Sequence, residues 1–197
     1  MADTPFTPGE VALLSGTKAR AIEKGIEQGV LGTRFGRVLP GDRRRRRMMA
    51  STAVGCAALF DRLDLDLPVT RKRQIARRLA SLPSAKWRTA RIELAPAVEL
   101  DVGRLVGDVM RDAERYRANR DTHIAVDPEI LGGTPVIRGT RLSVHAVLGR
   151  LEGGDSVDDL LADYPHVPRV AIEAAAMYAR AHPLVGRPGG RPWLKAA

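Results

Sequence analysis

The apolar positions at the start of the chain follow the spacing of two short helices. Thr7 and Glu10 have the arrangement of a capping box, with Pro8 at the first helical position, so we expect a helix from there to about residue 15. Gly16 predicts a turn, and Thr17 is the expected N-cap of a second helix that continues to about residue 28. A helix, a glycine turn and a second helix make the outline of a DNA-reading unit. The basic side chains expected on its surface are Lys18, Arg20 and Lys24.

The segment after the second predicted helix carries a turn signal and a run of positive charge. Pro40, Gly41 and Asp42 lie between residues that favour extended backbone, which predicts a β-hairpin wing. Five consecutive arginines follow, Arg43 to Arg47. Such a run is also typical of a solvated or disordered segment, but its place beside a helix-turn-helix favours contacts with phosphates. The candidate DNA contacts in this wing are Arg34, Arg37, Arg43 and Arg44.

The middle of the chain predicts three helices and one strand. Residues 48–63 are apolar enough for a buried helix, and Cys56 inside it is expected to be a core residue rather than a reactive thiol. Thr70 is the expected N-cap of a basic helix, and residues 87–94 alternate as a strand does. Residues 101–120 predict an amphipathic helix that either connects the two ends of the protein or supplies a dimer contact.

A glycine-rich motif stands out in the C-terminal half, Gly132-Gly133-Thr134-Pro135-Val136-Ile137-Arg138-Gly139-Thr140-Arg141. Its glycines can take positive φ, and the proline holds the residue before it in an extended conformation. Two short extended pieces, 135–137 and 140–142, predict a hairpin that is too small to be stable alone. We expect at least one of the hairpin's arginines to donate hydrogen bonds to backbone carbonyls. The residues of this motif that we expect to have a structural role are Gly133, Pro135, Gly139, Thr140 and Arg141.

Three helices are expected behind the hairpin. Ser143 caps the first, Ser156 and Asp159 resemble a capping box for the second, and the third runs from about residue 169 to 181. The fold class is therefore mainly α with short β-hairpins (α+β). The expected domains are a winged helix-turn-helix over 1–47, a connecting region over 48–121, a hairpin plus three-helix module over 122–182 and an extended tail over 183–197.

The motif and the segments after it closely resemble a known family. The residues from Asp127 through Val144, followed by Asp163-Tyr164-Pro165 and the small residues of the third helix, are similar to family 433 of the domains of unknown function. The resemblance covers about residues 124–182 and implies a relation to bacterial antitoxins of the VapB kind. Pro168 departs from it, because the family usually has Thr or Ser as the cap of the third helix. Residues 6–31 resemble the opening of MerR-like regulators, without the aromatic pair that these often carry in the second helix.

Charge is unevenly distributed along the chain. The 197 residues carry a formal net charge of +9. Residues 1–50 and 51–120 each carry +5, residues 121–182 carry −4, and the last fifteen residues carry +3. A polyanion such as DNA is therefore expected at the N-terminal part and the tail rather than at the acidic module.

The sequence shows no pattern typical of an enzyme. Its four histidines lack metalloprotease spacing, the glycine motif lacks the Lys-Ser/Thr of a P-loop, and no serine nucleophile elbow occurs. Asp61, Asp64 and Asp66 lie close together but lack the loop pattern of a cation site. With one cysteine, no long apolar stretch and no signal peptide, we expect a cytoplasmic protein without a metal or cofactor. His166 and His182 adjoin prolines and are expected to be solvated.

The resemblance implies the antitoxin of a type II toxin–antitoxin pair. Its partners would be a PIN-like ribonuclease toxin, which it neutralises by direct binding, and operator DNA, where a homodimer or a hetero-oligomer with the toxin represses the operon. In such antitoxins an extended segment often lies across the toxin and offers a basic group to its acidic site. The candidate toxin contacts are Arg180, Arg187, Arg191 and Trp193. The alternatives are a free-standing helix-turn-helix transcription regulator with a ligand or dimerisation domain, and a structural scaffold with no role at DNA.

Overall fold

The computed structural model describes residues 6–63, 65–95 and 97–184. It combines α-helices with short antiparallel hairpins, which confirms the expected α+β class. The helices are α1 (Pro8–Ser15), α2 (Ala19–Glu27), α3 (Thr52–Arg62), α4 (Val69–Ala80), α5 (Val102–His123), α6 (Val144–Glu152), α7 (Val157–Asp163) and α8 (Arg169–Ala181), with 3₁₀ turns η1 (Ser84–Thr89) and η2 (Leu131–Gly133). The strands are β1 (Arg34–Gly36), β2 (Arg46–Met48), β3 (Arg91–Ala95), β4 (Val98–Asp101), β5 (Ile124–Ala125) and β6 (Val136–Ile137). Within these ranges, no helix has both the length and the apolar character that crossing a membrane requires.

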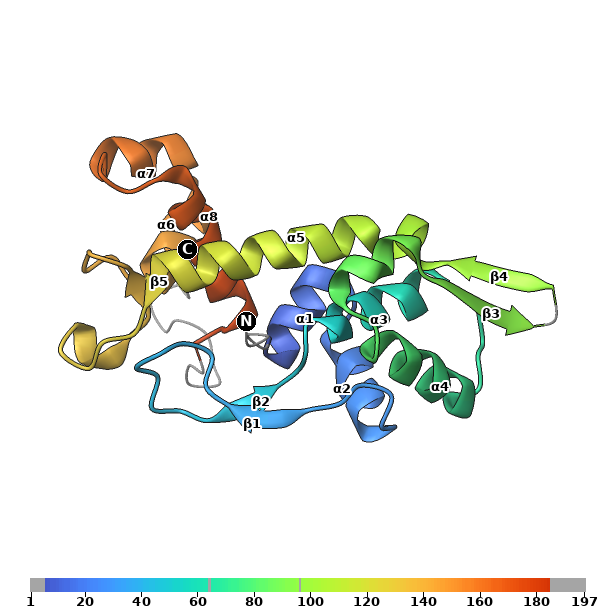
Figure 1. Ribbon diagram of the computed structural model, residues 1–197. Helices are drawn as coiled ribbons and strands as arrows, with labels where there is room; N and C mark the ends of the chain where they lie inside the picture. The colour runs from blue at the N-terminus through green and yellow to red at the C-terminus, as the bar shows by residue number, and fades with distance from the viewer. Residues whose placement is uncertain (1–5, 64, 96, 185–197) are drawn as a thin grey trace, which may run out of the picture.

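The long helix α5 is the axis of the molecule. It has 22 residues and begins where the Asp101 side chain accepts a hydrogen bond from the Arg104 N–H. Figure 1 shows α6 and α8 beside one end of α5 and the β3–β4 hairpin at the other, with α1 and α3 along its length. The helix packs on α3, α8 and η1 of the same chain. These contacts favour the connecting role predicted for it over a dimer contact.

The first hydrophobic core lies between α1, α3, α4, η1 and α5. Trp87 is buried in it, and its indole N–H donates to the Leu79 carbonyl at 3.2 Å. Gly55 lets α3 approach this ring, because a Cβ there would lie 2.3 Å from a Trp87 ring carbon and 2.7 Å from the Met110 sulfur. Cys56 is also buried in this core, and burial raises the pKa of its thiol to about 12, so its predicted core role is confirmed.

The second core surrounds α8 and includes the loop of the β1–β2 hairpin. Val38, Leu39 and Met48 are buried there with residues of β5, β6, α6 and α8. Gly41 of this loop has φ +85°, and a Cβ on it would lie 2.1 Å from the Val126 carbonyl oxygen. The domain boundary expected after residue 47 therefore falls within β2, and the hairpin loop rests on the C-terminal module.

Two elements of the middle region differ from the sequence-based expectation because of contacts distant in sequence. The helix expected from residue 48 begins at Thr52, since β2 pairs with β1 and Met49 pairs with Phe6. The prediction of a single strand over 87–94 is wrong for the first half of that range. Burial of Trp87 accompanies the 3₁₀ turn there, and β3 begins only at Arg91 and pairs with β4.

Two predicted N-caps are also wrong. Thr17 lies in the turn after α1, where its N–H donates to the Ala12 carbonyl at 3.1 Å, so Lys18 takes the N-cap position of α2. Thr70 lies inside α4, because the helix begins directly after Pro68. Neither helix has a side-chain cap.

Gly55→Ala tests the close packing of Trp87 and Met110 on α3. The added methyl group has no room, and we expect the free energy of unfolding to fall by about 1–3 kcal/mol. Gly149→Ala is the matched control, since an added Cβ at this α6 position has nothing within 4 Å. Helix propensity should raise its stability by about 0.5–1 kcal/mol. Urea denaturation followed by circular dichroism measures both, and equal stabilities would contradict the packing at Gly55.

Candidate nucleic-acid interface

The local sequence accounts for where α1 begins and ends. Thr7 Oγ1 accepts a hydrogen bond from the Glu10 N–H at 3.2 Å, and the Glu10 carboxylate accepts one from the Thr7 N–H at 2.7 Å, so both halves of the predicted capping box are present. Gly16 ends α1 with φ +71°. Helix α2 then buries Ile22 against the first core. The predicted basic residues Lys18, Arg20 and Lys24 are all exposed.

The β1–β2 hairpin has one face against the protein and one toward solvent. Its register pairs Arg34 with Met48, Phe35 with Arg47, and Gly36 with Arg46. Met48 is fully buried, whereas Phe35 is 67% exposed. Since side chains alternate along a strand, Phe35 and Arg47 share the outward face.

Two contacts hold α2 in place against its neighbours. The Arg47 guanidinium lies 2.8 and 2.9 Å from the two carboxylate oxygens of Glu23 and so joins the hairpin to α2. At the other end, the Nε of Arg73 on α4 donates to the Gln28 carbonyl at 2.6 Å. The sequence carried no signal for either contact, because the partners are 24 and 45 residues apart.

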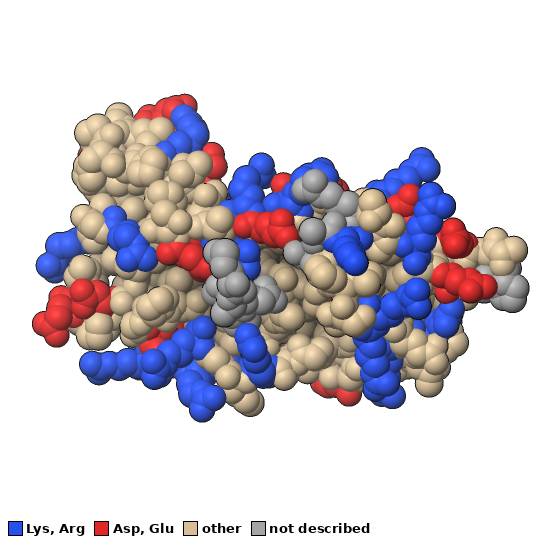
Figure 2. All heavy atoms as spheres, viewed as in Figure 1, with Lys and Arg blue, Asp and Glu red and all other residues tan. Residues whose placement is uncertain are grey.

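The predicted DNA contacts of the hairpin lie on the surface. The Leu39 carbonyl accepts from the Asp42 N–H, and the Asp42 carboxylate accepts from the Arg44 N–H at 2.8 Å, so the predicted turn is present. Figure 2 shows Lys and Arg side chains along the lower side of the molecule, where Figure 1 places this hairpin and its loop. The exposed arginines of the hairpin and its loop are Arg34, Arg37, Arg43, Arg44, Arg45 and Arg47.

The glycine-rich motif has the backbone that its sequence predicts, with one pairing that the sequence did not indicate. Gly133 and Gly139 have φ +83° and +77°, and Thr140 Oγ1 donates to the Ile137 carbonyl at 2.8 Å. The Ile137 N–H donates to the Leu142 carbonyl, which confirms the turn. The strand β6, however, pairs with β5, which follows α5 directly. Pro135 accepts from Val144 through its carbonyl, and Arg141 is exposed.

Arg138 fastens this motif to the end of α5. Its guanidinium donates to the carbonyls of Thr122 at 2.7 Å, Asp121 at 3.2 Å and Ile124 at 3.3 Å. The expectation that an arginine of the motif binds backbone carbonyls is confirmed. The carbonyls belong to the end of α5 and to β5, however, and not to the hairpin turn itself.

The three C-terminal helices begin as the sequence predicts. Ser143 caps α6, and Ser156 with Asp159 forms a capping box on α7. Pro168 precedes α8 without a side-chain cap. Arg180 is exposed near the end of α8. The other candidate toxin contacts, Arg187, Arg191 and Trp193, lie outside the described residues.

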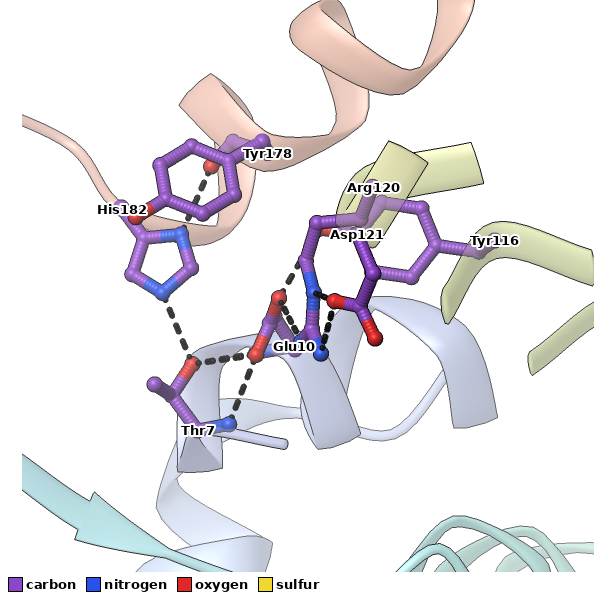
Figure 3. Close-up of polar contacts among 7 residues, drawn as sticks. All are labelled: Thr7, Glu10, Tyr116, Arg120, Asp121, Tyr178 and His182. Carbon is purple, nitrogen blue, oxygen red and sulfur yellow. Dashed lines mark hydrogen bonds and ion pairs between the residues drawn. The ribbon is translucent and has the colours of Figure 1, made fainter. Parts of the chain in front are cut away.

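A buried network joins α1 to α5 and α8 (Figure 3). One carboxylate oxygen of Glu10 accepts from Arg120 Nη1 and from the Tyr116 hydroxyl, both at 2.9 Å. The side chains of Glu10 and Arg120 are fully buried. Burial alone raises the pKa of the Glu10 carboxyl, but Arg120, with His182 and the Thr7 N–H, lowers it below its ordinary value of 4.5. The pair is therefore ionised inside the protein.

His182 extends this network to the last turn of the described chain. The expectation that it is solvated is wrong, since it is 8% exposed and stacks on Tyr178 with ring centroids 4.1 Å apart. Its Nδ1 lies 2.9 Å from the Tyr178 carbonyl and must donate to it. Its Nε2 then accepts from the Thr7 hydroxyl at 3.1 Å. Burial lowers the pKa of His182 below its ordinary value of 6.5 despite the opposing effect of Glu10.

A hollow of about 290 Å³ lies on the inner side of α2. Apolar side chains of the first core line it, and lysines and aspartates are also among its lining residues. Lys24 of α2 is one of these residues, so an occupant would touch the helix that carries the candidate DNA contacts. Within the described ranges, no three His, Cys, Asp or Glu side chains come together as a possible metal site.

We expect stability to fall with acidity in two steps. Because the folded-state pKa of His182 is depressed, the unfolded chain takes up its proton first, and stability declines as pH falls below about 6.5. A second decline follows below about 4.5, where Glu10 protonates in the unfolded chain. Urea titrations from pH 8 to 4 measure both. His182→Gln should reduce the first decline and leave the contribution of His145, since burial also lowers the pKa of that side chain, whereas His166→Gln, at an exposed histidine, should retain the whole decline. A first decline as large in His182→Gln as in the wild type would contradict the assignment.

Comparison with known proteins concerns one part of the chain. The family described as "Protein of unknown function (DUF433)" matches residues 124–179, from β5 to near the end of α8. "Uncharacterized protein y4eO" of Sinorhizobium fredii (strain NBRC 101917 / NGR234) is 44% identical over 64 residues, which are 32% of this chain and 29% of that protein. This chain therefore matches less than a third of its relative's length. No solved structure matches. Residues 124–179 are a DUF433 domain.

Proposed function

We propose that this chain is a DNA-binding antitoxin whose α1, α2 and β1–β2 hairpin act as a winged helix-turn-helix. The observation that carries the DNA-binding half is the joining of α2 and the hairpin by Glu23 and Arg47, with exposed cations on both elements. The loop of this hairpin is anchored through Leu39 in the second core. Its arginines are therefore presented by a fixed backbone, which supports a binding role over that of a merely solvated segment.

The dimensions of α2 suit the major groove of DNA. Its nine residues span about 13 Å, and the major groove, about 12 Å wide, admits an α-helix. Lys18 and Arg20 lie at its start, where recognition helices contact base edges. Arg37, Arg43 and Arg44 of the hairpin loop then neutralise phosphates.

The protein-binding half of the proposal rests on the DUF433 domain and the resemblance to antitoxins. Residues 121–182 carry a net charge of −4, which is unsuited to a nucleic acid. Arg180 is exposed near the end of α8 and leads into the tail that holds Arg187 and Arg191. An arginine inserted into the acidic site of a PIN-like ribonuclease would pair with carboxylates that otherwise hold Mg²⁺. The protein would act by binding, without catalysis of its own.

A transcription regulator controlled by a small ligand is the second candidate function. The hollow beside α2 favours it, because an occupant would contact the proposed recognition helix directly. This hollow lies in the N-terminal half, whereas the sequence suggested the C-terminal module as the ligand domain. A short reading frame for an acidic-site nuclease next to the gene supports the antitoxin, and its absence supports the regulator.

The DNA-binding half predicts a steep dependence of affinity on salt. Arg37→Gln and Arg43→Gln should each reduce the slope of log K against log salt by about 0.9 for the duplex upstream of the gene. Arg115→Gln is the matched control, because this exposed arginine lies on α5, along the opposite side of the molecule in Figure 1. Fluorescence anisotropy at several salt concentrations measures the slopes. Equal slopes in all three variants would remove the hairpin from the interface.

The protein-binding half predicts that the tail is required for neutralisation. A chain truncated after His182 keeps the described residues of both cores and should retain its melting temperature. It should lose inhibition of the neighbouring nuclease, measured by cleavage of a labelled RNA. Arg187→Gln and Arg191→Gln in the full chain then separate the two arginines. Unchanged inhibition by the truncated chain would exclude the tail from the mechanism.

A further inference from the structure

Phe35 is a large aromatic side chain that neither core uses. It is 67% exposed, whereas Phe6 is fully buried and Phe60 packs against the first core. On the same strand pair, Met48 faces inward and fills the second core. The hairpin is therefore held by its inner face, and the ring on the outer face adds nothing to that packing. A partner that covered this ring would remove apolar surface from water, which is favourable.

The surroundings of this ring are cationic. Arg47 is its cross-strand neighbour, and Arg45 Nη2 donates to the Phe35 carbonyl at 3.4 Å. Arg37 lies two residues further along the chain and is exposed, whereas the neighbouring Arg34 pairs with Met48 and so lies on the other face of the strand. A protein surface that covered Phe35 would have to neutralise or desolvate this group of arginines, whereas a nucleic-acid duplex brings phosphates to them. Charge complementarity therefore selects DNA as the occupant of this face.

We propose that Phe35 is an apolar wedge that packs into a base step of the DNA minor groove. The proposal rests on the DNA binding proposed above and adds a residue that reads deformability of the DNA rather than its charge. Minor-groove proteins insert Phe, Leu, Ile or Met between base pairs and bend the duplex there. The Glu23–Arg47 contact links the hairpin to α2, so a helix in the major groove would place the wedge beside it.

A wedge and a phosphate contact differ in their dependence on salt. Removing an arginine weakens binding and lowers the salt slope, because one fewer counterion is released. Removing the wedge weakens binding but leaves the slope unchanged, since no phosphate contact is lost. It also restores stacking at one base step, which 2-aminopurine fluorescence reports directly.

The experiment compares Phe35→Thr with Phe35→Ile in the full chain. Both replacements are β-branched strand formers, so both should keep the hairpin, while only isoleucine remains an apolar wedge. The probe is the duplex upstream of the gene, with 2-aminopurine placed at successive positions. We expect Phe35→Thr to raise Kd about tenfold, with an unchanged salt slope and without the fluorescence increase that wild type produces at one step. Phe35→Ile should retain most of the affinity and the fluorescence increase.

Each other outcome identifies which proposal fails. If wild type binds the duplex with a salt-dependent Kd and Phe35→Thr binds and reports stacking as wild type does, the wedge is excluded and DNA binding stands. If wild type binds no duplex even at low salt, both proposals fall. If Phe35→Thr changes sedimentation of the free protein and leaves DNA binding unaltered, the ring packs on a second copy of the chain, which also overturns the wedge.

Discussion

The ion pair between Glu10 and Arg120 is the contact on which the arrangement of the molecule depends. Burying two opposite charges costs several kcal/mol for each ion, and their attraction offsets this only with good geometry and further hydrogen bonds. Glu10 has both, because its carboxylate also accepts from Tyr116 and from the Thr7 N–H. The Arg120 guanidinium in turn lies over the Phe6 ring at 5.4 Å and within 2.9 Å of Asp121. Removing one partner would leave the other charge buried alone, at a cost of about 3–5 kcal/mol.

This pair is one of the contacts that place the candidate DNA-binding surface relative to the DUF433 domain. Glu10 is on α1, which α2 follows after a single glycine turn, and Arg120 is one turn before the DUF433 domain begins. Gly9 allows this close approach, because a Cβ there would lie 2.3 Å from the Ala181 carbonyl oxygen of α8. Gly41 makes a second contact of the same kind with Val126. The cationic N-terminal segment and the acidic C-terminal module are thus two surfaces of one packed framework, although their charges suggested independent units.

What could be predicted from the sequence was mostly local. Thr7, Gly16, Ser143 and Ser156 predict helix ends through their own neighbours, and the structure places them as expected. Apart from the N-caps expected at Thr17 and Thr70, the wrong predictions occur where a residue distant in sequence determines the structure. His182 precedes a proline, which is typical of a solvated turn residue. It is buried in a contact with Thr7, which is 175 residues away in the sequence. The candidate DNA-binding surface shows the same difference. Its exposed arginines were predicted from composition, whereas the contact between Glu23 and Arg47 could be found only in the folded structure.

The network also connects the two regions of the chain that are proposed to bind partners. His182 accepts from Thr7, the residue that caps α1, and the tail begins directly after it. A toxin bound next to His182 would therefore lie close to the first turn of the helix pair that is proposed to bind DNA. Coupling between binding sites is reciprocal, so if a bound toxin changed the affinity for DNA through this contact, bound DNA would change the affinity for the toxin by the same factor. Protonation of His182 would reverse its hydrogen bond with Thr7, because both ring nitrogens would then donate. The Thr7 hydroxyl would donate to the Glu10 carboxylate instead, which lies 3.3 Å away, so the contact between the two regions would survive the change of charge.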